Sequence, residues 1–488
     1  MRAHPSVRLL VVVAALILAT ADAAFAQRAS SRGPSSNIGV RAPSRSDGGY
    51  HGGGIYGRGY PSGYFAPRVG PVFEEDDIDD GGPQGISRRT QRSARRGSSG
   101  APAANERRLV PDEVVIEVAN SVSPQQIDAL QRRYRLTRIE SQTFQLSGTT
   151  LFRWRIPDRR SVASVVRALE ADRAVASAQP NYLFTLQQDE AKAASEGDAA
   201  QYELAKLRLP QAHALAKGDK VPVAVIDSGI DANHPELAGA IAESYDTLTA
   251  PMAPHKHGTA IAGLIAAHGK LMGAAPGAAI LAIRAFDGTG ASAEGTTFNI
   301  LKGLDWAAAH GARVINMSFA GPSDPAIHRS LAAAHKKGIV LVAAAGNAGP
   351  KSPPLYPAAD PNVIAVTATD AEDKLFPQSN RGHYIAVAAP GAQVLVAIPD
   401  GGYEVASGTS YAAAEVSGIV ALMLERNRDL TPDKARDTLL ATAKDLGPKG
   451  RDILFGAGLA DAYGALMAER APMAAAPQPV ERVSTGSR

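Results

Sequence analysis

Short apolar runs rich in β-branched residues recur through the second half of the chain, separated by longer stretches of helical periodicity. The runs cover 223–226, 279–285, 314–317, 339–344 and 363–366. Such runs are typical of strands that are buried on both faces of a sheet. The stretches 298–310 and 327–337 carry apolar residues at helical spacing, and Gly338 follows the second as a helix-ending glycine. This alternation predicts a doubly wound α/β domain with a parallel sheet over residues 201–468.

Residues 108–188 have a different pattern. Alternating apolar positions at 113–118 predict a strand, and Ser123 with the following proline predicts the start of a helix. Two further strand-like stretches follow, then Ser161 precedes a second amphipathic helix and 175–184 returns as a strand. The order β-α-β-β-α-β predicts a small ferredoxin-like α+β domain.

The first 26 residues have the pattern of a secretory signal. Arg2 and Arg8 precede or flank the start of an apolar run at 9–19, and Ala24-Phe25-Ala26 offers a cleavage site between small residues. A membrane anchor is the alternative, but the run is shorter than the roughly 20 residues that a spanning helix needs. We therefore expect an exported bacterial protein, periplasmic or extracellular.

Three segments have compositions that do not favour a packed core. Residues 27–107 are rich in Gly, Ser and Arg and include an acidic and a basic run, and residues 469–488 are rich in Pro, Ala and Ser. Residues 189–200 are rich in Ala, Glu and Asp. We expect the first two to be disordered and the third to be a linker between domains.

Composition excludes several classes of function. The chain of 488 residues has a net charge of +3, too small to indicate binding to nucleic acid or to an anionic membrane. It has no cysteine, which excludes disulfides, thiol catalysis and thiolate metal sites.

Three short blocks carry the residues of a nucleophilic triad. Asp227 stands in an Asp-Ser-Gly turn where the first predicted strand of the sheet ends. His257 stands in His-Gly-Thr, and Ser410 in Gly-Thr-Ser, each at the start of a predicted helix. In such a triad the serine supplies the nucleophilic oxygen, the histidine takes its proton, and the aspartate orients the imidazole and stabilises its cation.

A fourth candidate follows the predicted strand at 339–344. Ala345-Gly346-Asn347 places a side-chain amide where that strand ends. An amide donor in this place can stabilise the oxyanion of a tetrahedral intermediate. A turn asparagine is the alternative interpretation.

With these blocks the chain resembles a subtilisin-like serine protease with an N-terminal inhibitor-type propeptide. The resemblance runs from about residue 110 to residue 465. It rests on Val223-Ala224-Val225-Ile226-Asp227-Ser228-Gly229-Ile230-Asp231, His234-Pro235-Glu236-Leu237, His257-Gly258-Thr259, Ala344-Ala345-Gly346-Asn347, Ser407-Gly408-Thr409-Ser410, Ala389-Pro390-Gly391 and Gly456-Ala457-Gly458.

The resemblance implies a secreted serine endopeptidase made as a self-processing precursor, with protein or peptide substrates. Segment 108–188 would be its intramolecular chaperone and inhibitor, and cleavage would fall between about Leu186 and Gln201. Asp227, His257 and Ser410 would form the triad, and Asn347 the oxyanion hole. The substrate would pair with an edge strand and enter a pocket that accepts an uncharged, apolar side chain; the residues implied are Ser318, Phe319, Ala320, Gly321, Ala344, Ala345 and Gly346. Tyr356-Pro357 matches a cis peptide of the family.

Some positions depart from the family pattern. Ala414, followed by Glu415, stands where a proline is usual, and Ala320 replaces a common glycine. The stretch 268–273 is short where relatives have a calcium-binding loop, so calcium is possible but not implied, and we expect no other cofactor. His255 and His257 form an H-x-H pair, but a third metal ligand is not evident.

Three alternative classes of protein fit the same residues less well. An α/β-hydrolase places its serine first in a Gly-x-Ser-x-Gly elbow, whereas here the serine comes last and Ala412 replaces the second glycine. A sedolisin-type peptidase has a glutamate where this chain has His257. A catalytically silent binding protein would be expected to lack a triad member. The endopeptidase is favoured, with no nucleic-acid partner and no stable membrane span.

Overall fold

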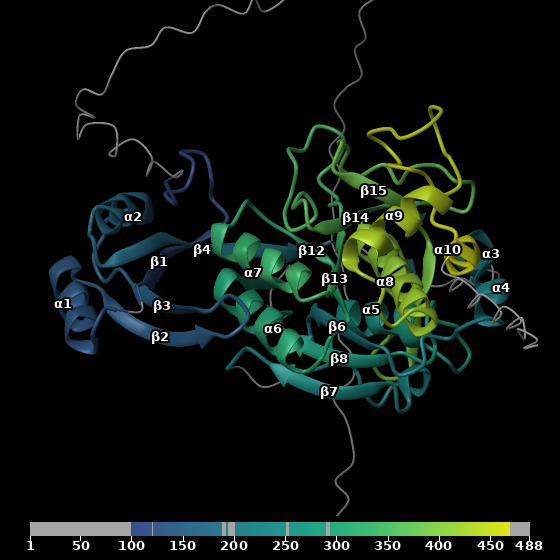
Figure 1. Cartoon of the computed structure of the whole chain (residues 1–488), viewed down its shortest axis with the longest axis horizontal. Coiled ribbons are helices and arrows are strands. Elements are labelled where there is room, and N and C mark those ends of the chain that lie inside the picture. Colours follow the sequence, from purple (N-terminus) through teal and green to yellow (C-terminus); the bar gives the residue numbers. More distant parts are fainter. Residues whose placement is uncertain are drawn as a thin grey trace, which may run out of the picture. The chain divides into compact units, whose positions relative to one another are not determined.

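The structure is a computed structural model that describes residues 99–119, 121–187, 192–193, 201–249, 253–288 and 293–468. The predicted signal peptide, the tail at 469–488 and most of segment 27–107 lie outside these ranges. Figure 1 shows the arrangement of the helices and strands.

A parallel sheet forms the centre of the larger domain. Its strands follow the order β15-β14-β13-β11-β6-β8-β7, and every neighbouring pair is parallel. Strands later in the chain add on both sides of β6, so the order reverses there and opens a crevice at the carboxyl end of that strand. The strands are β6 (Pro222–Asp227), β7 (Ile241–Asp246), β8 (Ala279–Arg284), β11 (Val314–Met317), β13 (Val340–Ala344), β14 (Val363–Thr369) and β15 (Ile385–Pro390).

Helices cover both faces of this sheet. α5 (Lys256–Ala266) and α8 (Thr409–Arg426) pack on one face, where Val223 and Val225 of β6 join their core. α6 (Thr297–Ala309) and α7 (Pro325–Lys336) pack on the other, against Ala224 and Ile226. The continuous apolar runs of the sequence are explained by burial on both faces. Smaller helices are α3 (Tyr202–Lys206), α4 (Leu209–His213), α9 (Pro432–Thr442) and α10 (Ala462–Ala468).

Helix starts differ in one respect that bears on the site. Thr296, Asp324 and Thr431 cap α6, α7 and α9 with side-chain oxygens that accept backbone N–H groups. α8 begins behind Gly408, with no side-chain cap. The first amides of α8 are therefore available to another acceptor.

The preceding segment forms a small antiparallel sheet with two helices. The sheet order is β2-β3-β1-β4. Trp154, Val166 and Leu169 lie in the core between sheet and helices and are fully buried. The elements are β1 (Leu109–Val118), α1 (Pro124–Tyr134), β2 (Thr137–Phe144), β3 (Thr149–Arg155), α2 (Val162–Glu170) and β4 (Val175–Leu186).

Strand β4 continues this sheet into the larger domain. It pairs with β10 (Glu294–Thr296), which pairs with β9 (Phe286–Asp287), and its end pairs with β12 (Phe319–Ala320). In the predicted linker, β5 (Lys192–Ala193) pairs with β17 (Gly402–Ala406), which also pairs with β16 (Val394–Ile398). The hydrophobic pattern did not predict the two- and three-residue strands.

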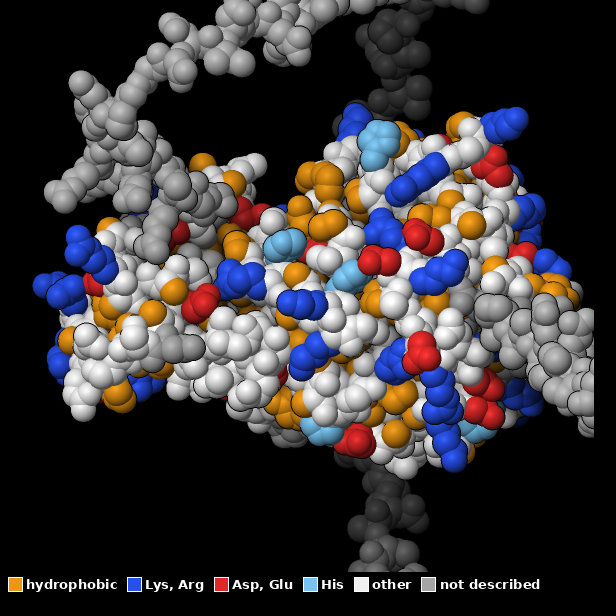
Figure 2. All heavy atoms as spheres, viewed as in Figure 1, with side chains coloured by type: hydrophobic (Ala, Val, Ile, Leu, Met, Phe, Trp, Pro, Cys, Tyr) orange, Lys and Arg blue, Asp and Glu red, His pale blue; other side chains and the backbone are white. Residues whose placement is uncertain are grey.

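The surface carries both signs of charge. Figure 2 shows Lys and Arg side chains interspersed with Asp and Glu side chains over the face that it draws. Within the described ranges, no helix combines the length and apolarity required to cross a bilayer.

Candidate active site

The crevice above β6 gathers the three predicted triad residues. Asp227 is the last residue of β6, His257 the second residue of α5, and Ser410 the second residue of α8. All three residues are completely buried. Because α5 and α8 pack together on one face of the sheet, residues 30 and 183 positions after Asp227 reach the same edge.

Asp227 and His257 are joined directly. His257 Nδ1 lies 2.7 Å from Asp227 Oδ1, which also accepts from Ser228 N at 2.7 Å and from Ser228 Oγ at 3.0 Å. His257 Nε2 is buried and has no hydrogen-bond partner among the described residues. An imidazole held at Nδ1 with a free Nε2 is arranged to accept a proton.

Ser410 has a different partner in this structure. Its hydroxyl donates to Ser318 O at 2.9 Å, and no hydrogen bond joins it to His257. The ring of the next residue, Tyr411, has its centroid 6.0 Å from that of His257, so the first turn of α8 lies beside the imidazole. A rotation of the Ser410 side chain would be needed to bring its hydroxyl to Nε2, and catalytic hydrogen bonds commonly tighten only in the reacting complex.

The Asn347 side chain is held by one end. Its Oδ1 accepts from Thr409 N at 3.1 Å and from Thr409 Oγ1 at 2.8 Å. Its Nδ2 is buried and has no hydrogen-bond partner among the described residues. A side-chain amide fixed at its oxygen therefore offers its N–H donors to the crevice.

The end of β4 occupies the crevice as an added strand. Phe319 pairs with Leu186 and Ala320 pairs with Thr185, both antiparallel. Gln187 N donates to Ser318 O at 3.2 Å and extends the pairing by one residue. The pairing stays in register at Ala320, so the methyl group at this position does not prevent the added strand.

Gln187 contacts the start of α8 and the backbone of Asn347. Its carbonyl oxygen accepts from Ser410 N at 3.4 Å, and its side-chain Oε1 accepts from Asn347 N at 2.8 Å. The residue is 8% exposed. Its side chain is uncharged and polar.

Ala344 is the last residue of β13, and Ala345 and Gly346 follow it just before Asn347. Both alanines are fully buried. Gly346 has a φ of 108°, and a Cβ there would come within 2.5 Å of Asn380 Nδ2, so only glycine fits. Asn380 Nδ2 and Tyr384 Oη both donate to Ala345 O, at 3.1 Å each.

Phe184 fills a second depression three residues before Gln187. Its ring is fully buried and meets Phe319 edge-on at 6.0 Å between centroids. A Cβ on Gly321 would lie 2.2 Å from this ring. The Phe184 ring can therefore pack here only because residue 321 has no side chain.

Several residues of the site were not singled out from the sequence as partners. Ser228 and Thr409 adjoin triad residues in the chain, so their closeness was a usable signal. Asn380 and Tyr384 come from a loop distant in sequence, which gives no such signal.

A metal has no obvious place beside these residues. No group of three or more His, Cys, Asp or Glu side chains suited to a metal occurs in the described part of the chain. The short stretch 268–273 packs against Glu236. The Glu236 carboxylate accepts hydrogen bonds from the backbone N–H groups of Gly269, Lys270 and Leu271 at 2.9–3.0 Å. The loop thus presents donors, not cation ligands, to this carboxylate.

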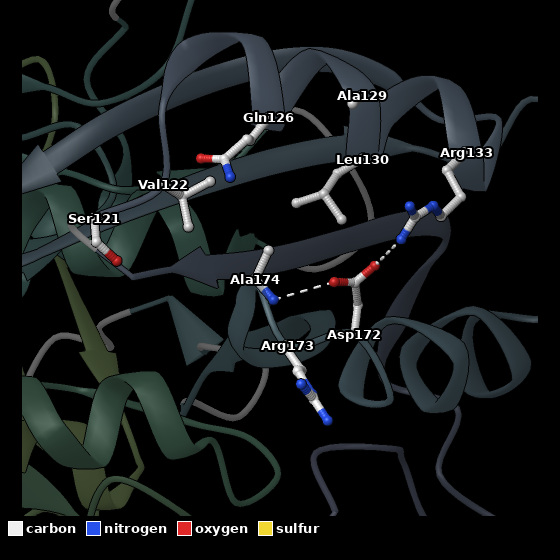
Figure 3. A pocket seen from close by; sticks show the side chains of 9 residues that line it. All are labelled: Ser121, Val122, Gln126, Ala129, Leu130, Arg133, Asp172, Arg173 and Ala174. Atoms are coloured by element: carbon white, nitrogen blue, oxygen red, sulfur yellow. Dashed lines mark hydrogen bonds and ion pairs between the residues drawn. The ribbon is translucent and has the colours of Figure 1, made fainter.

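A separate hollow lies in the N-terminal segment, between α1 and the turn that precedes β4 (Figure 3). Leu130 and Val122 form its apolar wall. Asp172 lies on one side of the hollow. Its carboxylate forms an ion pair with Arg133 at 2.7 Å and accepts a hydrogen bond from Ala174 N at 3.1 Å. Its lining contains no histidine and no pair of nucleophile and base.

Comparisons with known proteins agree with the geometry of the crevice. The sequence model described as the Subtilase family matches residues 218–458. Thermitase from Thermoactinomyces vulgaris is 37% identical over 243 residues, which are 48% of this chain and 86% of that protein. The chain belongs to the subtilase family.

Two further relatives support this assignment. Subtilisin E from Bacillus subtilis strain 168 is 36% identical over 270 residues, which are 53% of this chain and 69% of that protein. Fervidolysin from Fervidobacterium pennivorans, a keratinolytic enzyme related to subtilisin, matches with a TM-score of 0.63 at 25% identity. That match covers 75% of this chain but only 62% of fervidolysin. The protein therefore has the subtilisin-like α/β fold with a parallel sheet, and it is a serine-type endopeptidase.

Proposed function

We propose that this subtilase is a self-processing precursor whose triad is Asp227, His257 and Ser410, and that it cleaves its own chain between Gln187 and Gln188. The observation that carries the proposal is the 3.4 Å contact from Ser410 N to the carbonyl oxygen of Gln187. It supports Gln187 as the residue whose carbonyl carbon is attacked. The bond lies within the interval expected from the sequence.

In the proposed reaction, the Ser410 hydroxyl turns from Ser318 O to His257 Nε2. Its oxygen bonds to the carbonyl carbon of Gln187 while His257 takes its proton, and Asp227 stabilises the imidazolium that forms. The tetrahedral intermediate collapses by breaking the C–N bond to Gln188. The proton on His257 passes to the departing nitrogen, and water then hydrolyses the acyl-enzyme by the same steps.

The oxyanion would be held by two N–H donors, Ser410 N and Asn347 Nδ2. The free amide end of Asn347 and the uncapped start of α8 support this assignment. Donors that are fixed before the reaction stabilise the developing charge without reorganisation. Pairing along residues 318–321 would hold other substrates in the same way, by adding a strand.

We further propose that segment 108–188 is the propeptide and inhibitor, and that the protein is exported to the periplasm or beyond. Buried bonds between the two parts support the first point: Gln179 Nε2 donates to Asp324 Oδ1 at 2.8 Å, and Phe298 N donates to Asn181 Oδ1 at 3.3 Å. The pattern of residues 1–26 supports the second.

The test is expression of the full chain and of Ser410→Ala, followed by N-terminal sequencing and an assay of peptide hydrolysis. Wild-type protein should yield a fragment that begins at Gln188. The variant should stay joined across this bond and show no hydrolysis, because the attacking oxygen is gone.

A matched control is Ser141→Ala, an exposed serine on β2, the edge strand of the N-terminal sheet. This control should process normally. Normal cleavage at Gln187–Gln188 in Ser410→Ala expressed alone would contradict the proposal, since another agent must then cut the chain.

A further inference from the structure

His255, the first histidine of the H-x-H pair, is the N-cap residue of α5, two positions before His257. Its Nδ1 is 2.9 Å from Ser228 Oγ and 3.3 Å from the backbone N of His257. Ser228 in turn contacts Asp227. The side chain therefore reaches Asp227 through one intervening hydroxyl.

The hydrogen bonds of Ser228 show which atom donates in each contact between His255, Ser228 and Asp227. A serine hydroxyl has one proton to donate and two lone pairs to accept with. Ser228 Oγ has three neighbours at hydrogen-bonding distance: Asp227 Oδ1 at 3.0 Å, Gly258 N at 3.1 Å and His255 Nδ1 at 2.9 Å. Gly258 N can only donate, and the charged carboxylate is the stronger acceptor for the single hydroxyl proton. For the Ser228 hydroxyl to make all three hydrogen bonds, His255 must donate from Nδ1.

We propose that His255 is a positioning residue for the reaction, which donates from Nδ1 to Ser228 and so commits the Ser228 hydroxyl to Asp227. The contact with His257 N, at 3.3 Å, is the longer of the two at Nδ1 and is given up in this arrangement. Asp227 receives three donors on Oδ1, from Ser228 N, Ser228 Oγ and His257 Nδ1. The carboxylate is thereby fixed in the orientation that presents His257.

The surroundings of His255 favour a neutral ring with one N–H to place. Burial lowers the pKa of His255, and His257 and Lys256 lower it further, against the opposing effect of Asp227. Lys256 is itself 4.0 Å from Glu404 of β17. On the remaining side, the ring packs against the backbone at Gly288, where a Cβ would come within 2.5 Å of it.

Loss of the His255 donor has a predictable consequence. The Ser228 hydroxyl would be free to turn from Asp227, which would lose one of its three hydrogen bonds. The carboxylate would then be less firmly oriented toward His257. Turnover should fall, whereas substrate binding should not change.

The experiment compares His255→Ala, His255→Asn, Ser228→Ala and the double variant His255→Ala/Ser228→Ala. It measures kcat and KM per active site, with sites counted by a fluorophosphonate probe. His255→Ala should lower kcat about threefold to tenfold at unchanged KM. His255→Asn keeps an N–H donor on the atom bonded to Cγ, as in His255 Nδ1. This variant should therefore retain most of the parent kcat.

The double variant separates positioning from a merely structural role. If His255 acts through Ser228, the double variant should be no slower than Ser228→Ala alone. Losses that multiply would overturn the proposal, as would an unchanged kcat per site in His255→Ala or a failure of Asn to restore it. The inference rests on the proposed triad, but its failure is distinguishable: if the triad is wrong, the probe gives no adduct on Ser410 in the parent enzyme.

Discussion

The Asn347 side chain illustrates how one residue is prepared for a role before any substrate binds. Thr409 holds its oxygen with two donors, and its Nδ2 stays unpaired in a buried place. A buried donor without a partner costs stability. Its presence in the site therefore supports our proposal that Nδ2 binds an oxyanion.

Asn347→Ala should therefore lower kcat about 10²–10³-fold with little change in KM, the range known from subtilisin. The reason is that Nδ2 would meet the oxygen only as it gains charge in the transition state. Steady-state kinetics on a peptide substrate measures both constants. Asn233→Ala, at an exposed position, is the control, and an unchanged kcat in Asn347→Ala would remove this residue from the oxyanion hole.

At the residue scale, the motifs around Asp227, His257 and Ser410 named residues that the fold brings to one edge of the sheet. They could not predict that the Ser410 hydroxyl bonds to Ser318 O, because a side-chain rotation depends on neighbours that only the fold assembles. The contributions of Asn380 and Tyr384 were hidden for the same reason.

Helix α8 carries an unusual core residue, Glu415, one position after Ala414, where the family usually has proline. The residue is buried, its Oε2 has no hydrogen-bond partner among the described residues, and burial raises its pKa well above the usual value. Glu203 of α3, also buried, raises that pKa further. Burial and the nearby Glu203 carboxylate thus both disfavour ionisation of Glu415.

This burial makes stability depend on pH. At low pH the Glu415 carboxyl is protonated in both states and has no effect. As pH rises above the usual glutamate pKa, only the unfolded chain ionises, so the folded state loses stability until the raised pKa is reached. The loss from one such group is at most about 1.4 kcal/mol per pH unit.

The free energy of unfolding should therefore decrease less between pH 5 and pH 9 in Glu415→Gln than in the parent protein that keeps Glu415. Urea unfolding in a Ser410→Ala background, which prevents self-digestion, measures the difference. Glu372→Gln, at an exposed position, is the matched control and should follow the parent. An equal pH dependence in Glu415→Gln and the parent would show that Glu415 is not the responsible carboxyl.

At the scale of elements, the hydrophobic pattern predicted helices α6 and α7 and five strands of the central sheet, β6, β8, β11, β13 and β14, within a few residues. It did not predict β7 and β15 of that sheet, and it failed for β9, β10 and β12, which have two or three residues. A strand this short has no period to detect. Its existence depends on pairing with β4, which is a tertiary contact.

In the whole molecule, the N-terminal segment is held to the peptidase domain by contacts of several kinds. β4 adds a strand at the crevice, Arg329 pairs with Glu117 at 2.9 Å, and Lys302 pairs with Glu140. The exposed pairs contribute little each. The paired backbone and the buried Phe184 side chain are the larger stabilising contacts.

This arrangement leaves the crevice filled by the chain itself. A substrate that competes for residues 318–321 must first displace the end of β4. Release of the N-terminal segment after cleavage is thus the step that we expect to open the active site.

The central claim is that Ser410, activated by His257, is the nucleophile. The most direct measurement is mass spectrometry of the processed enzyme after reaction with a fluorophosphonate probe. We predict a single adduct on Ser410 that is lost in His257→Ala. A processed enzyme without an adduct, or with an adduct on another residue, would contradict the account.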